Sequence, residues 1–386
     1  MKAYPDSVPV SRRRFVGQLS VGAAALALAP KSFMQTSAQP KKLGVAIVGL
    51  GSYATGQIGP ALKLTENCQL MGVVTGDPAG KGKKWAANYG FPEKNIWSYE
   101  TMAQIADNKD IDIVYVITPN SMHADEVILA AKCGKHVISE KPFATNVADA
   151  ERAIAACKAA KVKLSIGYRL HFDPTVQEYM RLAKDKDFGP FMKMNGEFSF
   201  VARSQAWRQV KKYAGGGPLM DLGVYVMQAS CMGAGSVAPV AVSAKFDPTT
   251  KPEIFADVEE GLKWTMEFPG GQVAQCAASY NASANRFRAE GEKGWIEFKG
   301  ITQRPDGSKV ESENAFMYTN VRANTSKGPL TFPAVNQQAK QMDDFAACVR
   351  EGRESRVSGE MGVRDLKIIE AIYASAASGQ RVLVKA

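Results

Sequence analysis

The stretch that decides the fold is Leu43-Gly44-Val45-Ala46-Ile47-Val48-Gly49-Leu50-Gly51-Ser52-Tyr53-Ala54. Its first six residues are almost continuously apolar, as in a buried parallel strand, and the next six match G-x-G-x-x-G/A. In this motif Gly49 allows a tight turn, Gly51 lets the backbone approach a pyrophosphate, and Ala54 permits close helix packing. A helix that begins here offers backbone N–H groups to phosphates. The stretch therefore predicts a dinucleotide-binding unit.

Strands and helices alternate from this stretch to about residue 167. Apolar runs predict strands at 70–74, 111–117, 136–139 and 163–167, with helical patterns at 56–66, 81–89, 121–133 and 147–160. Alternation of this kind is typical of right-handed βαβ units on a parallel sheet. We therefore expect an N-terminal Rossmann domain, a doubly wound parallel sheet.

The pattern changes near residue 190. Predicted strands follow at 192–201, 240–246, 259–268, 273–280, 287–290 and 294–298, and two helical patterns lie near 335–351 and 359–378. Such a run favours a C-terminal α+β domain with a large, mostly antiparallel open sheet. The expected fold class is α/β, with domains at 39–163 and 164–386 and the C-terminal helices packing back. An open sheet needs covering, so we expect a homodimer or homotetramer.

Composition excludes several classes of protein. The chain has 386 residues, 45% hydrophobic and 22% charged, which excludes a disordered or collagen-like chain. Five of the basic residues behind the net charge of +10 lie in residues 1–38, and no dense Lys/Arg block follows. We therefore expect no nucleic-acid partner. No apolar run reaches the length of a membrane span, so no membrane anchor is expected.

Residues 1–38 are predicted to be a twin-arginine signal peptide. Arg12 and Arg13 precede a weakly apolar stretch at 21–29 that is too short to span a bilayer comfortably, and small residues lead up to Ala38, the expected cleavage site. The signal predicts export of the folded protein to the periplasm. An uncleaved basic tail is the alternative.

The second predicted strand ends in Thr75-Gly76-Asp77. An NAD-specific site usually offers a carboxylate at this strand tip for the ribose 2′-hydroxyl. Thr75 stands there, with Lys81, Lys83 and Lys84 close behind, and a hydroxyl with cationic groups suits a 2′-phosphate. The sequence therefore favours NADP, while Asp77 keeps NAD open and a solvated helix face would also explain the lysines.

Two further segments carry candidate chemistry. Glu140-Lys141-Pro142 follows a predicted parallel strand, at the sheet edge where such folds bind ligands. Asp221 and Tyr225 follow three consecutive glycines and, in a helix, would share one face. They could form an acid/base pair, or serve as a cap residue and a packed tyrosine. Three histidines and six cysteines without a C-x-x-C pair give no support to a metal site.

In this order, the motifs resemble the Gfo/Idh/MocA oxidoreductase family. The motifs that carry the resemblance are Gly49-x-Gly51, Pro119-Asn120-Ser121-Met122-His123, Gly134-Lys135-His136-Val137, Glu140-Lys141-Pro142, Gly167-Tyr168-Arg169, Trp207-Arg208 and Gly216-Gly217-x-x-x-Asp221-x-Gly223-x-Tyr225. The resemblance runs from about residue 43 to the C-terminus. Many relatives have histidine in place of Tyr225.

The resemblance implies a role for each matching residue. Lys141 and Tyr225 would be the catalytic pair, with Asp221 positioning the substrate. The cofactor would be held by Gly49, Leu50, Gly51, Ser52, Tyr53, Thr75, Gly76, Lys81, Pro119, Asn120, His123, Glu140, Lys141, Arg169, Trp207 and Arg208. The lysine near the 2′-phosphate is displaced by one position, so the phosphate's partner stays open.

The activity that the resemblance implies is that of a periplasmic NADP-dependent sugar oxidoreductase. It would oxidise an aldose at C1 to the lactone and reduce a second sugar, ketose or aldose, to the alditol with retained NADP(H). Lys141 would stabilise the phenolate of Tyr225, since a free tyrosine ionises only near pH 10. The substrates would be mono- or oligosaccharides. A dehydrogenase with exchangeable NAD(P) and a non-catalytic sugar-binding protein are the alternatives.

Overall fold

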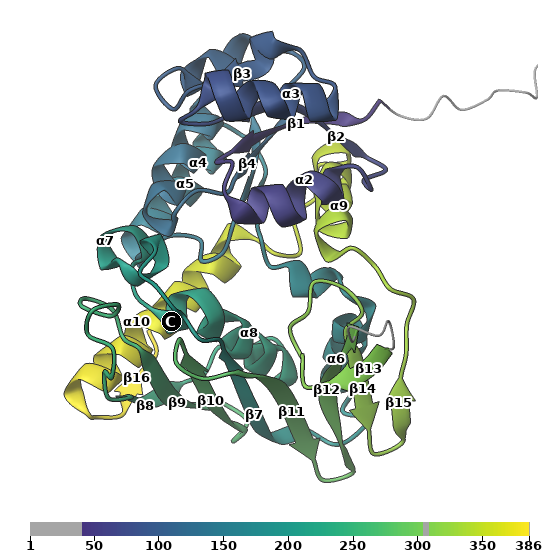
Figure 1. Ribbon diagram of the computed structural model, residues 1–386. Coiled ribbons are helices and arrows are strands. Elements are labelled where there is room, and N and C mark those ends of the chain that lie inside the picture. The colour runs from purple at the N-terminus through teal and green to yellow at the C-terminus, as the bar shows by residue number, and fades with distance from the viewer. Residues whose placement is uncertain (1–40, 304–308, 386) are drawn as a thin grey trace, which may run out of the picture. The chain divides into compact units, whose positions relative to one another are not determined.

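The computed structural model describes residues 41–303 and 309–385. The predicted signal peptide at 1–38 lies outside the described residues. The predicted fold class is confirmed: a parallel Rossmann sheet is followed by a domain with a large, mostly antiparallel sheet (Figure 1). No helix in the described ranges is long and apolar enough to cross a bilayer.

The first sheet has six parallel strands in the order β3-β2-β1-β4-β5-β6. Their bounds are β1 Leu43–Val48, β2 Cys68–Val74, β3 Ile96–Trp97, β4 Ile113–Val116, β5 His136–Ser139 and β6 Leu164–Ile166. The helices between them are α2 Gly59–Leu62, α3 Lys83–Tyr89, α4 His123–Lys132 and α5 Val147–Ala159. Strand order reverses between β1 and β4, and ligands of open α/β sheets bind outside the carboxyl ends of strands at such a point.

The second sheet has ten strands in the order β15-β14-β12-β11-β7-β10-β9-β8-β16, with β13 beside β12. Their bounds are β7 Phe191–Ser199, β8 Ala241–Phe246, β9 Gly261–Glu267, β10 Val273–Ser279, β11 Ala284–Gly291, β12 Gly294–Gln303, β13 Lys309–Ser312, β14 Arg322–Thr325, β15 Gly328–Leu330 and β16 Val382–Leu383. Only β7 and β10 pair in parallel among the strand pairs of this sheet that the structure describes.

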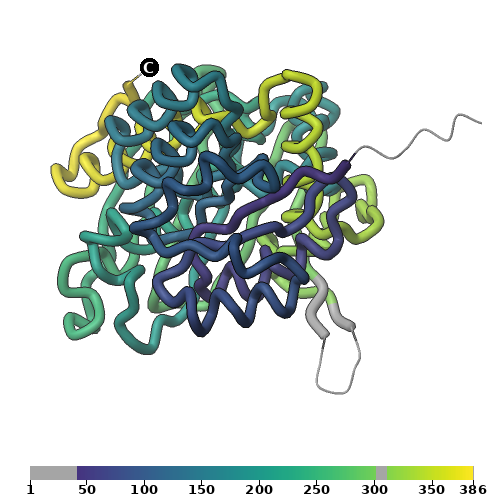
Figure 2. The backbone as a smooth tube through the Cα atoms, turned by 90° about the horizontal axis from the view of Figure 1, so that it is seen from above, coloured from purple at the N-terminus to yellow at the C-terminus, as the bar shows by residue number. Residues whose placement is uncertain are grey.

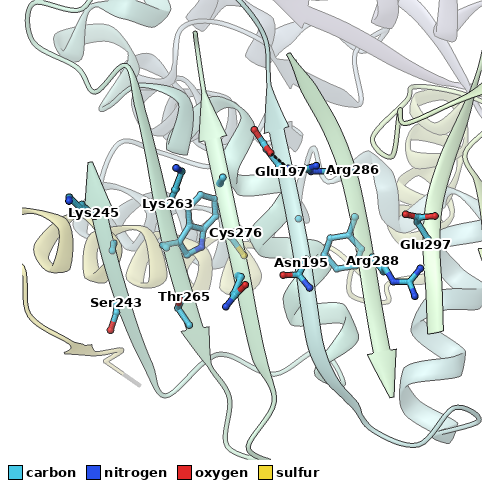
Figure 3. A pocket seen from close by; sticks show the side chains of 16 residues that line it. Asn195, Glu197, Ser243, Lys245, Lys263, Thr265, Cys276, Arg286, Arg288 and Glu297 are labelled. Atoms are coloured by element: carbon cyan, nitrogen blue, oxygen red, sulfur yellow. Dashed lines mark hydrogen bonds and ion pairs between the residues drawn. The ribbon is translucent and has the colours of Figure 1, made fainter. Parts of the chain in front are cut away.

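The two faces of this sheet differ in chemistry. One face packs its buried residues, such as Trp264 and Phe287, against α8 Val224–Gly233 and neighbouring helices. The other face presents a hollow of mixed polar and charged side chains, in which Glu197 pairs with Arg286 at 2.8 Å (Figure 3). The alternation of apolar and polar residues along each strand produces both faces.

Helix α6 was not predicted from the sequence, and α8 was considered only as a condition for Asp221 and Tyr225 to share a face. In α6 Pro174–Asp185, Asp173 caps the first turn, and Val176, Tyr179 and Leu182 are buried at helical spacing. Helix α8 is buried on nearly every side, so its sequence has no amphipathic period to reveal it. The predicted helix at 56–66 ends earlier, because α2 stops at Leu62.

The last two long helices connect the domains. Helix α9 Gln337–Glu351 returns to the first sheet, where Met342 and Phe345 share a core with Val45 and Ile47. Figures 1 and 2 both show yellow-green α9 beside the purple start of the described chain. Helix α10 Gly359–Ser378 packs against β8 and α5. The two sheets are thereby held together, and the cleft between them is where the predicted site residues meet.

Candidate active site

A cavity of about 510 Å³ lies where the carboxyl ends of β4 and β5 face the second domain. Ten of the predicted site residues line it: Tyr53, Asn120, His123, Glu140, Lys141, Arg169, Trp207, Arg208, Asp221 and Tyr225. The other predicted residues are not part of its lining: Pro119 lies in the loop after β4, and the rest lie around the glycine loop and the tip of β2. The structure therefore divides the predicted set into a substrate end and a nucleotide end.

Lys141 and Asp221 connect the two domains at the bottom of the cavity. The Lys141 Nζ donates to the Asp221 backbone oxygen at 2.7 Å and lies 3.5 Å from its Oδ1. The Asp221 Oδ2 lies 3.3 Å from Arg208 Nε and accepts a hydrogen bond from the Tyr280 hydroxyl at 3.1 Å. Burial opposes ionisation of Asp221, but Lys141 and Arg208 outweigh it and lower the pKa of this carboxyl. Asp221 is thus held as a carboxylate, an acceptor for substrate hydroxyls.

Tyr225 presents its phenol to the same cavity. Its hydroxyl accepts a hydrogen bond from Arg169 Nε at 3.3 Å, and the Lys141 Nζ lies 4.6 Å from the centre of its ring. The ring packs against Phe198 and Phe316, with centroids 5.6 and 6.1 Å away. A phenol beside two cations is a group that can accept and return a proton. Burial disfavours the Lys141 charge, yet Tyr225 and Asp221 outweigh it, and the pKa of Lys141 is raised.

The glycine-rich entry to the helical segment of Asp221 and Tyr225 is fixed by close backbone packing. Gly215 has a φ of +80°, and a Cβ on Gly217 would lie 2.3 Å from the Glu259 carbonyl oxygen. The Glu259 carboxylate accepts hydrogen bonds from the backbone N–H groups of Gly217 and Leu219. It also accepts one from the Tyr373 hydroxyl at 2.8 Å. These contacts fix where the helical segment begins and therefore help to position Asp221 in the cavity.

Glu140 is buried directly behind the lysine. It accepts a hydrogen bond from the Tyr115 hydroxyl at 2.8 Å and another from the Lys141 backbone N–H at 3.2 Å. Burial raises the pKa of Glu140, although Lys141 opposes the shift. A Cβ on Gly167 would lie 2.8 Å from the Glu140 carboxylate, so any larger residue there would displace this buried carboxyl group.

The loop after β4 supplies Pro119, Asn120 and His123. The Asn120 side chain donates to the Ala214 backbone oxygen at 2.8 Å and so connects the two domains. Both ring nitrogens of His123 lie 2.9 Å from backbone oxygens, one of Thr118 and one of Pro142. His123 therefore fastens the two loops that form this side of the cavity.

The nucleotide end begins at the glycine loop. Gly49 has a φ of +95°, and a Cβ there would lie 2.9 Å from the Ile117 carbonyl oxygen. A Cβ on Gly51 would meet nothing within 4 Å, so the backbone there is open to an approaching group. Ser52 is exposed, whereas the Leu50 side chain is buried in the core, leaving only its backbone for a ligand. An open glycine loop ahead of a helix fits the pyrophosphate of a dinucleotide.

The tip of β2 also fits an adenosine ribose. Thr75 is buried, while Gly76 and Lys81 are exposed beside it. The Asp77 carboxylate accepts hydrogen bonds from the backbone N–H groups of Gly80 and Lys81, which lower its pKa. Asp77 therefore caps the helical turn that carries Lys81, and the lysine side chain stays free to meet a ligand.

Several residues of the site were missed by the sequence interpretation. Phe198, Phe316 and Tyr318 line the cavity, while Tyr280 and Glu259 lie outside its lining and hydrogen-bond to the segment that carries Asp221. No motif marks them, because their neighbours in space are remote in the chain. In the described ranges, no three His, Cys, Asp or Glu side chains gather where a metal ion could be held.

Two family models cover the chain. One, described as an oxidoreductase family with an NAD-binding Rossmann fold, matches residues 43–168, and the other, its C-terminal alpha/beta domain, matches residues 184–384. The chain belongs to the Gfo/Idh/MocA oxidoreductase family. The family resemblance predicted from the motifs is therefore confirmed.

Individual proteins similar to this chain are also oxidoreductases or dehydrogenases by name. The chain is 27% identical over 354 residues to D-xylose 1-dehydrogenase [NADP(+)] of Haloarcula marismortui, covering 89% of this chain and 93% of that protein. A crystal structure of aldose-aldose oxidoreductase from Caulobacter crescentus, complexed with glycerol, matches with a TM-score of 0.82 and 38% identity over 89% of this chain and all of that one. A levoglucosan dehydrogenase structure, 20% identical with a TM-score of 0.74, covers 90% of this chain and all of its own and shares the fold.

Proposed function

We propose that this protein is an NADP-dependent sugar oxidoreductase that oxidises an aldose at C1 to the lactone and reduces a second sugar to the alditol with a retained cofactor. The observation that carries the proposal is the phenol of Tyr225, which lies on the cavity wall beside Arg169 and Lys141. The 38% identity to a protein named aldose-aldose oxidoreductase supports this substrate class. The tyrosine in place of the more frequent histidine also resembles glucose–fructose oxidoreductase.

The residues of the chain divide the work of the reaction. The Tyr225 oxygen would take the proton of the anomeric hydroxyl and give it back when the second sugar is reduced. Asp221, kept ionised by Lys141 and Arg208, would accept hydrogen bonds from substrate hydroxyls. Phe198, Phe200 and the other aromatic side chains of the cavity would cover the apolar faces of the sugar ring. Bound NADP would supply the hydride acceptor and, once reduced, the hydride donor.

The glycine loop and the tip of β2 would hold this cofactor. Gly51 leaves the backbone open for the pyrophosphate, and Thr75 with Lys81 suits the 2′-phosphate. A relative named for NADP(+) supports the choice of cofactor.

The decisive experiment adds an aldose to purified protein that has received no cofactor. Retained NADP predicts that the near-ultraviolet band of reduced nicotinamide develops and then disappears when a second sugar is added. No band without added NADP(+), but steady turnover with it, would indicate the exchangeable dehydrogenase. No band and no turnover with any aldose would indicate the sugar-binding protein.

We also propose export to the periplasm by a twin-arginine signal. The paired arginines at 12 and 13 support it, and a cofactor loaded in the cytoplasm would explain why the folded protein is exported. Arg12→Lys combined with Arg13→Lys should leave the precursor in the cytoplasm. Unchanged periplasmic yield would contradict this.

Finally, we propose that the protein is a homodimer or homotetramer. The open face of the ten-stranded sheet carries both signs of charge, among them Lys263, Arg288 and Glu297 (Figure 3). Such a face can be complementary to a second copy of itself. Analytical ultracentrifugation of the mature protein should show an oligomer, and a monomer at micromolar concentration would contradict the proposal.

A further inference from the structure

Arg169 is a buried cation without a direct ion pair in the part of the chain that the structure describes. It follows β6 in the turn Arg169–Phe172, and only 2% of its surface is exposed. Its Nη atoms donate to the backbone oxygens of Met317 and Phe316, both at 2.7 Å, and to the side-chain oxygen of Gln337. These acceptors are neutral, and no direct ion pair to Arg169 is found within the described residues, although the carboxylates of Glu140 and Asp173 interact with its charge at longer range. A buried charge without a counter-charge in direct contact is costly, so its presence needs a reason.

The fourth contact of the guanidinium supplies that reason. Arg169 Nε donates to the Tyr225 hydroxyl oxygen at 3.3 Å, and the guanidinium carbon lies 4.8 Å from the centre of the Tyr225 ring. On another side it lies 4.2 Å from the centre of the Tyr318 ring. Because a guanidinium can only donate, the phenol oxygen must be the acceptor in this hydrogen bond. Any proton on that oxygen is then left to point elsewhere.

Lys141 is placed differently. Its Nζ donates to Asp221, and it faces the ring of Tyr225 at 4.6 Å from the centre. The hydrogen bond to the phenol oxygen that the structure contains comes from Arg169. The two cations thus act on different groups, Lys141 mainly on the carboxylate and Arg169 on the phenol.

We propose that Arg169 is a catalytic residue that stabilises the phenolate of Tyr225 through the Nε hydrogen bond, while Lys141 holds Asp221. The inference rests on the proposed function. In the oxidation, the C1–O–H proton moves to the Tyr225 oxygen and the C1–H bond gives its electron pair, as hydride, to oxidised NADP. The C1–O bond becomes a carbonyl, and the phenolate becomes a phenol. Arg169 stays protonated throughout, so it stabilises the charged phenolate more than the phenol that the reaction forms.

The competing explanation is that Arg169 only ties together the segment of Phe316 and Met317 and the start of α9. The two explanations differ in what they predict when the phenol is absent. A catalytic Arg169 should lose its effect in Tyr225→Phe, because the hydrogen bond no longer has an acceptor. A structural Arg169 should matter equally in both backgrounds.

The experiment compares Arg169→Gln and Arg169→Lys, each with and without Tyr225→Phe. Arg356→Lys is the matched control, since its guanidinium lies over the Phe172 ring at 5.2 Å and it does not line the cavity. We measure kcat for aldose oxidation across pH, the NADP content and the melting temperature. Arg169→Gln should lower kcat about 10- to 100-fold, the loss expected for a charge-assisted hydrogen bond. It should also move the acidic limb of the pH profile to higher pH.

Arg169→Lys keeps the charge but not the planar fork, so it should restore part of the rate. In the Tyr225→Phe background, either substitution should change kcat less than about threefold. An equal loss in both backgrounds with an unmoved pH profile would overturn the inference, and if Arg169→Gln does not fold, Arg169→Lys decides by the same comparison. A wild-type protein that turns over no aldose would overturn the proposed function, and this inference with it.

Discussion

The nucleotide end and the substrate end of this site are built in different ways. At the nucleotide end, one loop and the tip of one strand present mainly backbone, and the important feature is the empty space that Gly51 leaves. At the substrate end, side chains from the loop after β5 and from the turn after β6 converge on the phenol of Tyr225 in α8. A local motif can describe the first kind of site, whereas the second exists only after the chain has folded.

The largest effect is expected from Tyr225→Phe, at the substrate end. Phenylalanine keeps the packing against Phe198 and Phe316, so folding and NADP content should survive. The group that accepts the proton is lost, and general acid–base catalysis typically contributes about 10²–10⁴-fold. Steady-state kinetics of both half-reactions should show the same loss, because one phenol serves both directions.

Tyr213→Phe is the matched control, because this exposed tyrosine does not line the cavity. It should leave kcat unchanged. If the Tyr225→Phe protein keeps more than about a tenth of the wild-type rate, the loss is smaller than the contribution of a general base. Tyr225 would then be a packing residue.

A smaller and more selective effect is expected at the nucleotide end, from Lys81→Ala. The Asp77 cap uses the backbone N–H of Lys81, so removing the side chain leaves the helical turn intact. Loss of a charge-assisted contact to the 2′-phosphate should weaken NADP binding about 10- to 100-fold and change NAD binding little. Titration of cofactor-free protein with both nucleotides measures the difference.

Lys184→Ala, which removes an exposed lysine of α6 in the second domain, is the control and should bind both nucleotides as the wild type does. Equal weakening of NADP and NAD in Lys81→Ala would mean that the lysine serves the pyrophosphate. In that case a side chain at the nucleotide end would contribute to the binding of both cofactors and not only to the choice between them.

The same contrast explains how far the sequence could be interpreted. The Rossmann strands and the glycine loop could be predicted because period, turn and motif are local properties of the chain. Asp221 and Tyr225 could be nominated from their spacing, and the family resemblance paired Tyr225 with Lys141, but the hydrogen bonds to Tyr280 and Arg169 could not be predicted. Tyr280 and Glu259 became visible only in the folded structure, since hydrogen bonds across 59 and 42 residues leave no mark in a local pattern. Helix α8 could be considered only as a condition, because complete burial removes the helical period that would have predicted it.

The smallest effect is expected at Glu126 in α4, which is hydrogen-bonded to Thr118 of the cavity lining. Thr118, on the cavity wall, donates to one oxygen of this carboxyl, and the other oxygen is buried without a hydrogen-bond partner among the described groups. Burial raises the pKa of Glu126 to about 8. The folded protein therefore keeps a proton that the unfolded chain, with a glutamate pKa of about 4.3, has already released.

Stability should consequently fall as pH rises from about 4.3 towards 8, because the folded state binds more protons than the unfolded state across that range. Glu126→Gln keeps the shape of the side chain and removes its titration. The free energy of unfolding of the variant should therefore increase relative to that of the wild type as pH rises. A tenfold difference in acidity between the folded and unfolded states corresponds to about 1.4 kcal/mol, and relaxation around the carboxylate should reduce the total gain near pH 8 to about 1–2 kcal/mol. Urea unfolding at several pH values measures it, with exposed Glu253→Gln as a control that should show no change. If the difference in free energy of unfolding between Glu126→Gln and the wild type does not vary with pH, Glu126 is already ionised in the folded protein. The Thr118 hydroxyl would then donate its hydrogen bond to a carboxylate.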